Sequence, residues 1–237
     1  MPYFYGFDWT YLVLVLPCVL LSLWASSSFK STFNKYSSQY SIRRITGADA
    51  ARRELAHNGV GGVRIERVSG SLTDHYDPKA NVIRLSDTVY DSTSTAAIGV
   101  ACHEAGHAVQ YAQNYGPIKL RAAIIPATNI GSRLAMPLIL VGLLLTFLED
   151  FSFTLIYLGI ACFALSLVFQ LITLPVEFNA SRRAIAAIEQ GGILTQDEQV
   201  GAKKTLKAAA MTYVAATAVA LAQLLRLLIL FGRRRDD

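Results

Sequence analysis

The chain has 237 residues, of which 53% are hydrophobic, and its formal net charge at pH 7 is +5. A mean hydropathy of +0.37, with charges crowded into some stretches and scarce in others, excludes an ordinary soluble domain and is typical of a membrane protein with a polar module. No basic patch with interleaved aromatic residues occurs, so we expect the charge to favour anionic lipid and we expect no nucleic-acid partner.

The first apolar segment covers residues 9–25, between Asp8 and Lys30. It lacks the basic start of a signal peptide, is long for the apolar region of one, and no small-residue cleavage site ends it. We therefore predict an uncleaved transmembrane helix within residues 1–28.

Residues 29–117 have the composition of a folded polar module. A short helix is expected at Ala50–His57, capped near Thr46. Two segments with strand character, Val63–Val68 and Asn81–Leu85, are separated by a turn-rich stretch. A β-hairpin is the economical interpretation of this pair.

The module ends in a motif at Val100–Val109, which reads V-A-C-H-E-A-G-H-A-V. A helix is expected at Ala96–Ala112, and residues four apart on a helix share one face. The imidazoles of His103 and His107 can therefore bind one zinc ion, and Glu104 would lie beside the open coordination position.

A chance match and a structural zinc site are the alternatives for this motif. The chain has only four histidines, and two of them fall in the required spacing. Structural zinc sites are mostly rich in cysteine and closed, whereas Cys18, Cys102 and Cys162 are widely spaced. Cys102 would point about 100° away from His103 around the helix, which favours core packing. The pattern favours catalytic zinc and no disulfide framework.

Residues 118–237 hold the remaining apolar segments. Residues 134–148 are short for a span, 153–174 form a clear one, and 208–231 form a fourth. Between the last two, residues 177–207 are polar and helical in pattern, interrupted by two glycines.

The distribution of lysine and arginine predicts the orientation in the membrane. With four spans, the basic residues after span one and between spans three and four share one side; they are Lys30, Lys35, Arg43, Arg44, Arg182, Arg183, Lys203, Lys204 and Lys207. Arg233–Arg235 lie on the other side and are fewer. We expect the module and its motif to face the cytoplasm and both termini to lie outside.

A zinc hydrolase needs a third protein ligand. Glu177 is the best candidate, because it follows Pro175 at the cytoplasmic end of span three, where a new helix can begin. The alternative is a first-turn glutamate favoured only by the helix dipole. Asp74, His75 and Asp77 in the turn-rich stretch are rival ligands.

Four blocks of this sequence carry a family resemblance. They are S-L-T-D-H-Y-D-P at 71–78, R-L-S at 84–86, A-I-G-V-A-C-H-E-A-G-H-A-V-Q at 97–110 and L-P-V-E-F-N-A-S-R-R-A at 174–184. Together they resemble the YugP-type neutral zinc metallopeptidases, which are bacterial membrane proteins. The resemblance covers nearly the whole chain, including the placement of the spans.

The architecture is also similar to the HtpX and CAAX prenyl protease group, whose members are membrane gluzincins with a glutamate ligand on a later helix. The resemblance implies one Zn²⁺ per chain, held by His103, His107 and Glu177. In that group an aspartate four residues after the glutamate orients a zinc histidine; here Ser181 takes that place, with Asn179 nearby. Either side chain could accept a histidine N–H, more weakly.

The implied activity is hydrolysis of peptide bonds at the cytoplasmic surface of the bacterial inner membrane, with Glu104 as general base. Candidates to stabilise the oxyanion are His75, Tyr76, Arg182 and Arg183. The substrate would be a peptide or a membrane protein, whose backbone could dock on a free edge of the Asn81–Leu85 strand. The alternatives are an inactive zinc-containing membrane scaffold or binding protein, and a zinc hydrolase acting on a lipid or another amide.

We therefore expect a mainly α membrane protein. Its four-helix transmembrane bundle would carry a small cytoplasmic α+β zincin-like module, made of a β-hairpin or short sheet and the HExxH helix. The expected divisions are the first span at 1–28, the metallopeptidase module at 29–117, and the remaining spans at 118–237 with the third-ligand helix at 177–207.

Overall fold

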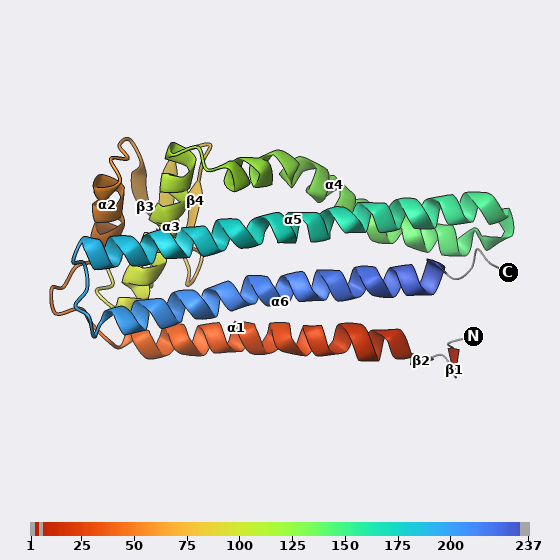
Figure 1. Cartoon of the computed structure of the whole chain (residues 1–237), viewed down its shortest axis with the longest axis horizontal. Coiled ribbons are helices and arrows are strands. Elements are labelled where there is room, and N and C mark those ends of the chain that lie inside the picture. The colour runs from red at the N-terminus through yellow and green to blue at the C-terminus, as the bar shows by residue number, and fades with distance from the viewer. Residues whose placement is uncertain (1–2, 5–6, 233–237) are drawn as a thin grey trace. The chain divides into compact units, whose positions relative to one another are not determined.

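The computed structural model describes residues 3–4 and 7–232, and it is mainly helical (Figure 1). Four of its helices are long and apolar enough to cross a membrane; they are Tyr11–Ser37, Gly116–Leu144, Asp150–Gln190 and Gln199–Gly232. The four expected spans are therefore present as candidates. Arg233–Arg235, used above for the orientation, lie outside the described residues.

The elements follow one another along the chain with short connections. They are β1 Tyr3–Phe4, β2 Phe7–Asp8, a π-helix Tyr11–Val15, α1 Leu16–Ser37, α2 Gly47–His57, β3 Arg64–Val68, β4 His75–Asp77, β5 Val82–Ser86, α3 Thr95–Ala112, α4 Gly116–Leu144, a 3₁₀ turn Thr146–Leu148, α5 Glu149–Gln190 and α6 Gln199–Gly232. The short helix predicted to be capped near Thr46 is α2, and the helix predicted at Ala96–Ala112 is α3.

Two compact units share these helices. The first comprises Met1–Trp24, Leu120–Leu174 and Tyr213–Asp237, and the second comprises Ala25–Lys119 and Pro175–Thr212. The segment with Glu177 thus belongs to the same unit as the motif helix, although more than sixty residues separate them in the sequence.

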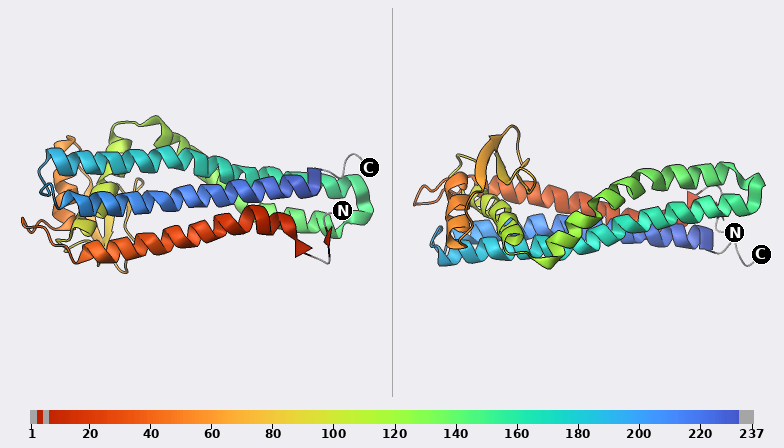
Figure 2. Two further views of the ribbon diagram at one scale, coloured as in Figure 1. Left: turned by 60° about the horizontal axis from the view of Figure 1, so that its bottom comes forward. Right: turned by 90° about the horizontal axis from the view of Figure 1, so that it is seen from above.

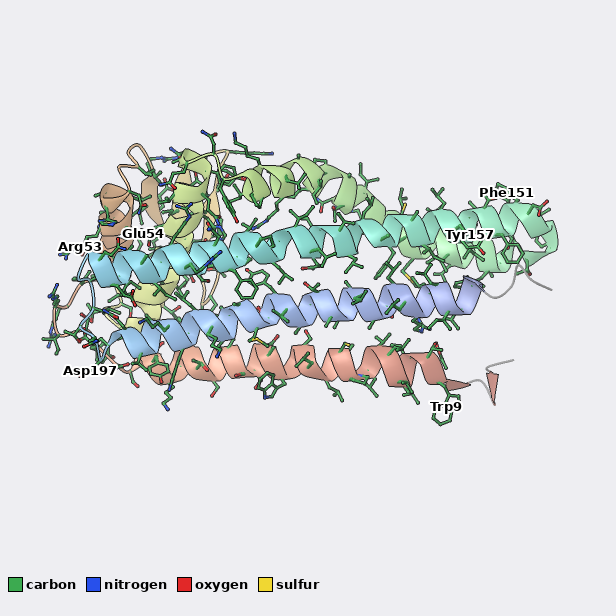
Figure 3. All side chains as sticks on the ribbon, in the orientation of Figure 1. Trp9, Arg53, Glu54, Phe151, Tyr157 and Asp197 are labelled. Atoms are coloured by element: carbon green, nitrogen blue, oxygen red, sulfur yellow. The ribbon has the colours of Figure 1, made fainter. Side chains whose placement is uncertain are left out.

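Large apolar side chains are exposed throughout the first unit. Phe151 is 54% exposed and projects from α5 beside Tyr157 (Figure 3), and Leu144 and Leu158 are exposed on α4 and α5. Helices α4 and α5 approach closely at Gly159, where a Cβ would lie 2.8 Å from the Ala135 carbonyl oxygen. Exposed apolar side chains and small residues at helix contacts are what lipid surroundings favour.

The sheet of the second unit has the strand order β3-β5-β4. Strand β3 pairs with β5 in parallel, from Arg64 opposite Val82 to Val68 opposite Ser86, while β4 pairs with β5 antiparallel. The prediction of a hairpin between the first and last of these strands was wrong. Parallel strands need a crossover connection, and the stretch read as turns supplies it and contains β4.

The observed hairpin is the one between β4 and β5. Asp77 closes its turn, because its Oδ1 accepts hydrogen bonds from the backbone N–H groups of Lys79 at 2.9 Å and Ala80 at 3.2 Å. Strand β5 is consequently the central strand, paired on both sides. The expectation that Asn81–Leu85 offers a free edge to substrate was therefore also wrong; the outer strands are β3 and β4.

Helix α3 forms the centre of the second unit. Its N-cap is Ser94, whose hydroxyl accepts from the Ala97 N–H, and most of its residues are buried. One apolar cluster packs α3 against α1, α2 and the sheet; another packs it against the ends of α5 and α6. Strands β4 and β5 contact α3 (Figure 2). Cys102 is a buried free thiol in the second cluster, which agrees with its expected packing role.

Helix α5 differs from the prediction at its C-terminal part. No new helix begins after Pro175; the proline lies inside one continuous helix, Glu149–Gln190. The candidate span in it has 41 residues, about 60 Å at 1.5 Å per residue, which is twice the roughly 30 Å of a bilayer's hydrocarbon core. The part after Pro175 is therefore long enough to extend beyond the lipid and to belong to the polar unit.

Glu54 on α2 is a fully buried carboxyl group (labelled in Figure 3). Among the described residues, no N–H or O–H group donates to either of its oxygens, and the Cys102 thiol lies beside it. Burial raises the pKa of Glu54 to about 8. Between about pH 5 and 8 the folded chain therefore keeps a proton that the unfolded chain has lost, so the free energy of unfolding falls as the pH rises, by up to about 1.4 kcal/mol per pH unit.

We expect Glu54→Gln to remove this pH dependence. The unfolding temperature of the variant, relative to wild type, should rise steadily from pH 5 to pH 8 in thermal scans of the detergent-solubilised protein followed by circular dichroism. Glu66→Gln, an exposed exchange on β3, serves as the control. Parallel pH profiles for wild type and Glu54→Gln would show that the folded chain holds no extra proton there.

Candidate metal centre

The two motif histidines lie one turn apart on the same face of α3. Their ring centroids are 4.8 Å apart and their planes are inclined by 82°. Both side chains are nearly buried, at 13% and 11% exposure for His103 and His107. The i, i+4 spacing thus produces the paired imidazoles that the sequence predicted.

Gly106 allows α5 to approach this face of α3. A Cβ at this position would lie 2.8 Å from the carbonyl oxygen of Ala180 and 3.3 Å from its Cα. On α5 the facing residues Ala180, Ser181 and Ala184 are small and buried. Glycine on α3 and small residues on α5 therefore allow the two helix backbones to lie close together, which a larger side chain would prevent.

This close approach places Glu177 between the two imidazoles. Its Oε2 lies 3.1 Å from Nε2 of His103 and 3.5 Å from Nε2 of His107, and its side chain is 3% exposed. One ligand atom from each of the three residues lies within 4.8 Å of the others. Within the part of the chain that the structure describes, this is the group of side chains able to hold a metal ion.

The rival ligands from the turn-rich stretch have other partners. Asp74 accepts hydrogen bonds from the backbone N–H and the hydroxyl of Ser86, at 2.7 and 2.9 Å. Asp77 accepts from Arg84 at 3.1 Å, and His75 lies on the exposed side of β4 with its Nδ1 2.8 Å from the Thr73 carbonyl. None of the three belongs to the cluster around His103.

Gln110 fixes the orientation and tautomer of His107. Its Nε2 donates to the Val176 carbonyl at 2.8 Å and to Asn179 Oδ1 at 2.9 Å, so its Oε1 is left to face His107 Nδ1 at 3.0 Å. An amide oxygen accepts, so Nδ1 of His107 carries a proton and Nε2 is the ring nitrogen that faces Glu177.

Ser181 takes the equivalent place at the other histidine. Its hydroxyl lies 3.1 Å from Nδ1 of His103, as the sequence suggested for Ser181 or Asn179. Asn179 instead accepts hydrogen bonds from Gln110 and from Nε of Arg183, the latter at 2.7 Å. The partner of Nδ1 of His103 is thus a neutral hydroxyl.

The chemistry of this donor set fits a zinc ion. Two imidazole lone pairs and a buried carboxylate converge, and such a group of acceptors needs a cation or a proton between them. Burial lowers the pKa of His107, but its hydrogen bond to Glu177 and the charges of Glu177 and Glu104 outweigh this, so the pKa is raised. The negative charge that raises this pKa would equally favour a cation bound at the same place.

Glu104 follows His103 on α3 and lies three residues before His107, so it shares a face with the second histidine. The side chain is mostly buried, and its charge acts on both His107 and Asp74. Burial and the neighbouring Glu104 carboxylate raise the pKa of Asp74. The arrangement puts one carboxylate beside the three ligands without making it a ligand itself.

The residues proposed for oxyanion stabilisation lie in different surroundings. The Tyr76 ring packs on Tyr111 of α3, with centroids 5.6 Å apart, and its hydroxyl donates to Asn81. Arg183 is held by Asn179 and by Gln113, whose Oε1 lies 2.6 Å from Nη1. Arg182 is exposed on α5. Each of these side chains thus has its own surroundings, and the structure does not single one out as an oxyanion donor.

Two residues important for this geometry were not singled out from the sequence. Gly106 stands between the histidines and has no polar atom in a side chain to suggest a role. Gln110 lies three residues after His107, so helical spacing places both on one face, and this spacing was the available signal. What it contacts on α5 could not be read from the sequence.

We expect Gln110→Ala to weaken zinc binding by about 10–100-fold, because loss of an outer hydrogen-bond partner of a ligand histidine typically has this effect. The affinity can be measured by competition with a chelator of known zinc affinity. Gln113→Ala, one turn further along α3 and bonded only to Arg183 in this network, should change the affinity less than threefold. Equal affinities for Gln110→Ala and wild type would contradict the role of Gln110.

Comparison with known proteins shows which family this chain belongs to. Residues 11–232 match the family described as "Putative neutral zinc metallopeptidase". The chain belongs to this family. A relative from Bacillus subtilis (strain 168), "Putative membrane protease YugP", is 47% identical over 227 residues, which make up 96% of this chain and 99% of that protein. No solved structure matches the chain at a significant level.

Membership of the zinc metallopeptidase family confirms the resemblance inferred from the sequence. The family description names zinc, and the matched range contains His103, His107 and Glu177, which form the possible metal-binding group. The family description therefore points to zinc, and the geometry supplies three residues able to hold such an ion.

Proposed function

We propose that this chain is a membrane-embedded zinc metalloendopeptidase. The observation that carries the proposal is the convergence of His103, His107 and Glu177 from two helices, with Glu104 beside them. Three protein ligands leave the fourth position of a tetrahedral zinc ion open, which is the difference between catalytic and structural sites. The family membership supports the same activity.

When bound, zinc supplies a Lewis acid that polarises a carbonyl oxygen and lowers the pKa of a water molecule to about 7. Glu104 takes the proton of the attacking water as general base and returns it to the leaving amine. Gln110 holds His107 in the orientation that presents Nε2, and the Ser181 hydroxyl orients His103 through its Nδ1. The nearly complete burial of Glu177 keeps its charge directed at the metal rather than at solvent.

We place the active site at the cytoplasmic surface of a bacterial inner membrane, with both chain termini outside. The lysines and arginines that follow the first apolar segment, and those that lie between the third and fourth apolar segments, support this side. The substrate is then a peptide or a membrane protein. A site at the end of long apolar helices is suited to chains that emerge from the bilayer.

The test is Glu104→Gln, which keeps the shape of the side chain and removes the base. We expect cleavage to fall by at least about 10²–10⁴-fold, the typical contribution of general acid–base catalysis, while zinc content stays near that of wild type. Cleavage is measured by proteomic profiling of membrane and peptide substrates, and zinc by elemental analysis of the same preparation. Glu66→Gln, an exposed glutamate on β3, is the matched control.

The outcome also separates the alternatives. A scaffold that keeps zinc for stability would give equal, negligible cleavage for wild type and Glu104→Gln. A zinc hydrolase of lipids or other amides would turn over those compounds, and not peptides, in a manner that depends on Glu104. Either result would overturn the peptidase proposal.

A further inference from the structure

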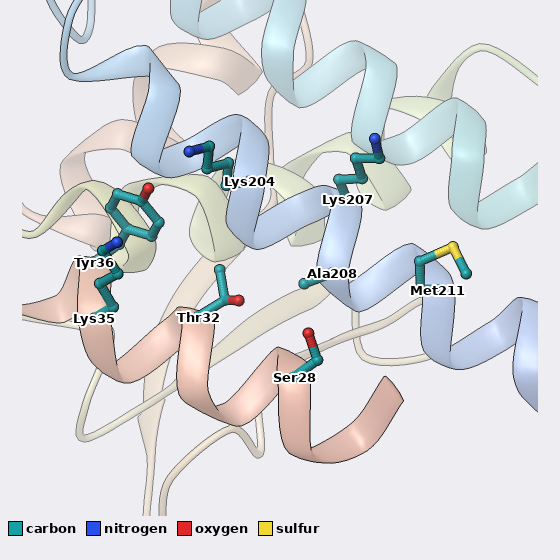
Figure 4. A pocket seen from close by; sticks show the side chains of 8 residues that line it. All are labelled: Ser28, Thr32, Lys35, Tyr36, Lys204, Lys207, Ala208 and Met211. Carbon is teal, nitrogen blue, oxygen red and sulfur yellow. The ribbon is translucent and has the colours of Figure 1, made fainter. Parts of the chain in front are cut away.

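A pocket separate from the metal centre lies between α1 and α6 (Figure 4). Its volume is about 310 Å³, and its lining residues are Ser28, Thr32, Lys35, Tyr36, Lys204, Lys207, Ala208 and Met211. All belong to the second unit, and none takes part in the site described above. Three of the eight are lysines and none is acidic, so the pocket is cationic.

The lysine charges are not neutralised within the described part of the chain. Lys204 and Lys207 have no carboxylate partner there, whereas the adjacent Lys203 pairs with Glu189 at 2.5 Å. The Lys35 ammonium lies 5.7 Å from the centre of the Tyr36 ring, which leaves its donors available. Uncompensated like charges around one hollow repel one another, and an anion bound there would remove that repulsion.

Hydroxyl groups at the floor of the pocket complement the lysines. Ser28 and Thr32 lie one turn apart on α1, and both side chains point towards α6 (Figure 4). No hydrogen bond within the described residues engages either hydroxyl. Ammonium and hydroxyl groups lining one pocket are donors of the kind that the oxygens of a phosphate group accept from.

The pocket lies at corresponding ends of two candidate spans. Ser28–Tyr36 are the last turns of the span Tyr11–Ser37, and Lys204–Met211 are among the first turns of the span Gln199–Gly232. Both helices are longer than the roughly 20 residues needed to cross the hydrocarbon core, so these ends are long enough to reach the level of the lipid headgroups. Ala208 and Met211 give the pocket an apolar side.

We propose that this pocket binds the phosphate of an anionic glycerophospholipid. The lysines and hydroxyls hold the headgroup, and Ala208 and Met211 contact the start of an acyl chain. The volume of about 310 Å³ suits a headgroup and not a whole lipid. A zwitterionic lipid binds less well, because its quaternary amine would be brought among three ammonium groups.

The test measures lipid binding to the delipidated, zinc-containing full-length protein in a neutral detergent. Dioleoylphosphatidylglycerol and dioleoylphosphatidylcholine are titrated separately, and bound lipid is counted by native mass spectrometry. We expect one saturable phosphatidylglycerol per chain, bound at least tenfold more tightly than phosphatidylcholine. The triple variant Lys35→Gln, Lys204→Gln, Lys207→Gln should lose at least tenfold in affinity for phosphatidylglycerol.

Matched variants keep the test decisive. The control triple Lys30→Gln, Lys79→Gln, Lys119→Gln removes the same charge outside the pocket and should bind within twofold of wild type. Ala208→Phe fills the pocket without changing any charge, and it should weaken binding at least tenfold even if the lysine triple fails to fold. Equal losses in the two lysine triples, or unchanged binding in Ala208→Phe, would overturn the proposal.

Two soluble competitors identify the source of the phosphate. Inorganic phosphate and glycerol 3-phosphate are added at millimolar concentration to the phosphatidylglycerol complex. Retention of the lipid supports a membrane ligand. Complete displacement by either compound would show a site for a soluble anion, and the lipid proposal would then be wrong. None of these readouts requires peptidase activity, so the proposed function can fail without affecting them.

Discussion

Replacing Glu177 by glutamine should remove zinc from the purified protein while leaving it folded. The exchange keeps the size of the side chain but replaces the buried carboxylate, which lies 3.1 and 3.5 Å from the two histidine nitrogens, by a neutral amide. Without the negative charge, the two imidazoles alone must bind the dication. We expect the zinc affinity to fall by more than the roughly 10–100-fold that loss of an outer partner causes, and cleavage to fall with it.

The zinc content after dialysis against a weak chelator measures this effect. Asp77→Asn is the matched control, since Asp77 was a rival ligand from sequence and here only closes the β4–β5 turn and binds Arg84. That variant should keep its zinc. Stoichiometric zinc in Glu177→Gln, or its loss in Asp77→Asn, would show that the third ligand lies elsewhere.

Gly106→Ala should disrupt the centre through packing alone. In an isolated helix this exchange would stabilise by about 1 kcal/mol, because glycine is the poorer helix former. Here the new methyl group would lie 2.8 Å from a backbone oxygen of Ala180, and backbone cannot rotate away as a long side chain can. Helix α5 must therefore shift, and overpacking of this kind typically costs about 1–3 kcal/mol. The tertiary contact should outweigh the helix propensity.

A shift of α5 also moves Glu177 away from the histidines. We expect Gly106→Ala to lower both the unfolding temperature and the zinc affinity, the latter by at least about tenfold, which corresponds to about 1.4 kcal/mol. Gly116→Ala is the control, because nothing lies within 4 Å of a Cβ at that position. A Gly106→Ala protein that binds zinc normally and melts no earlier would contradict the view that helix contact positions the third ligand.

The two histidine rings of this centre are oriented by neutral hydrogen-bond partners. At His103 the partner of Nδ1 is the neutral hydroxyl of Ser181. Nδ1 of His107 is hydrogen-bonded to the side chain of Gln110. The amide group of Gln110 in turn donates to the Val176 carbonyl and to Asn179. Orientation in this protein thus comes mainly from an ordered amide network linking α3 and α5, and less from charge.

Local pattern was enough to predict the parts of the fold that depend on short-range spacing. Four spans follow from runs of apolar residues, and α3 follows from its cap and from the absence of proline between Ala96 and Ala112. The histidine pair follows from the rise of a helix, since four residues make about one turn. None of these conclusions requires knowing what lies opposite in space.

The errors arose where long-range pairing decided the outcome. Alternation of apolar residues identified β3 and β5 as strands but said nothing about their relative direction, and the parallel pairing left β5 without a free edge. Pro175 suggested a helix start, yet α5 is continuous through it and approaches α3 closely at Ala180. In both places a weak local preference was overruled by contacts between distant segments.

The sequence by itself determined that this is an apolar chain with four candidate spans and a zinc-type histidine pair that has a glutamate beside it. Only the tertiary structure decided which carboxylate completes the site and how the histidines are oriented. The reason is physical: the spacing along one helix is set by its own hydrogen bonds, whereas the distance between α3 and α5 is set by the Gly106–Ala180 contact, whose partners lie far apart in the chain.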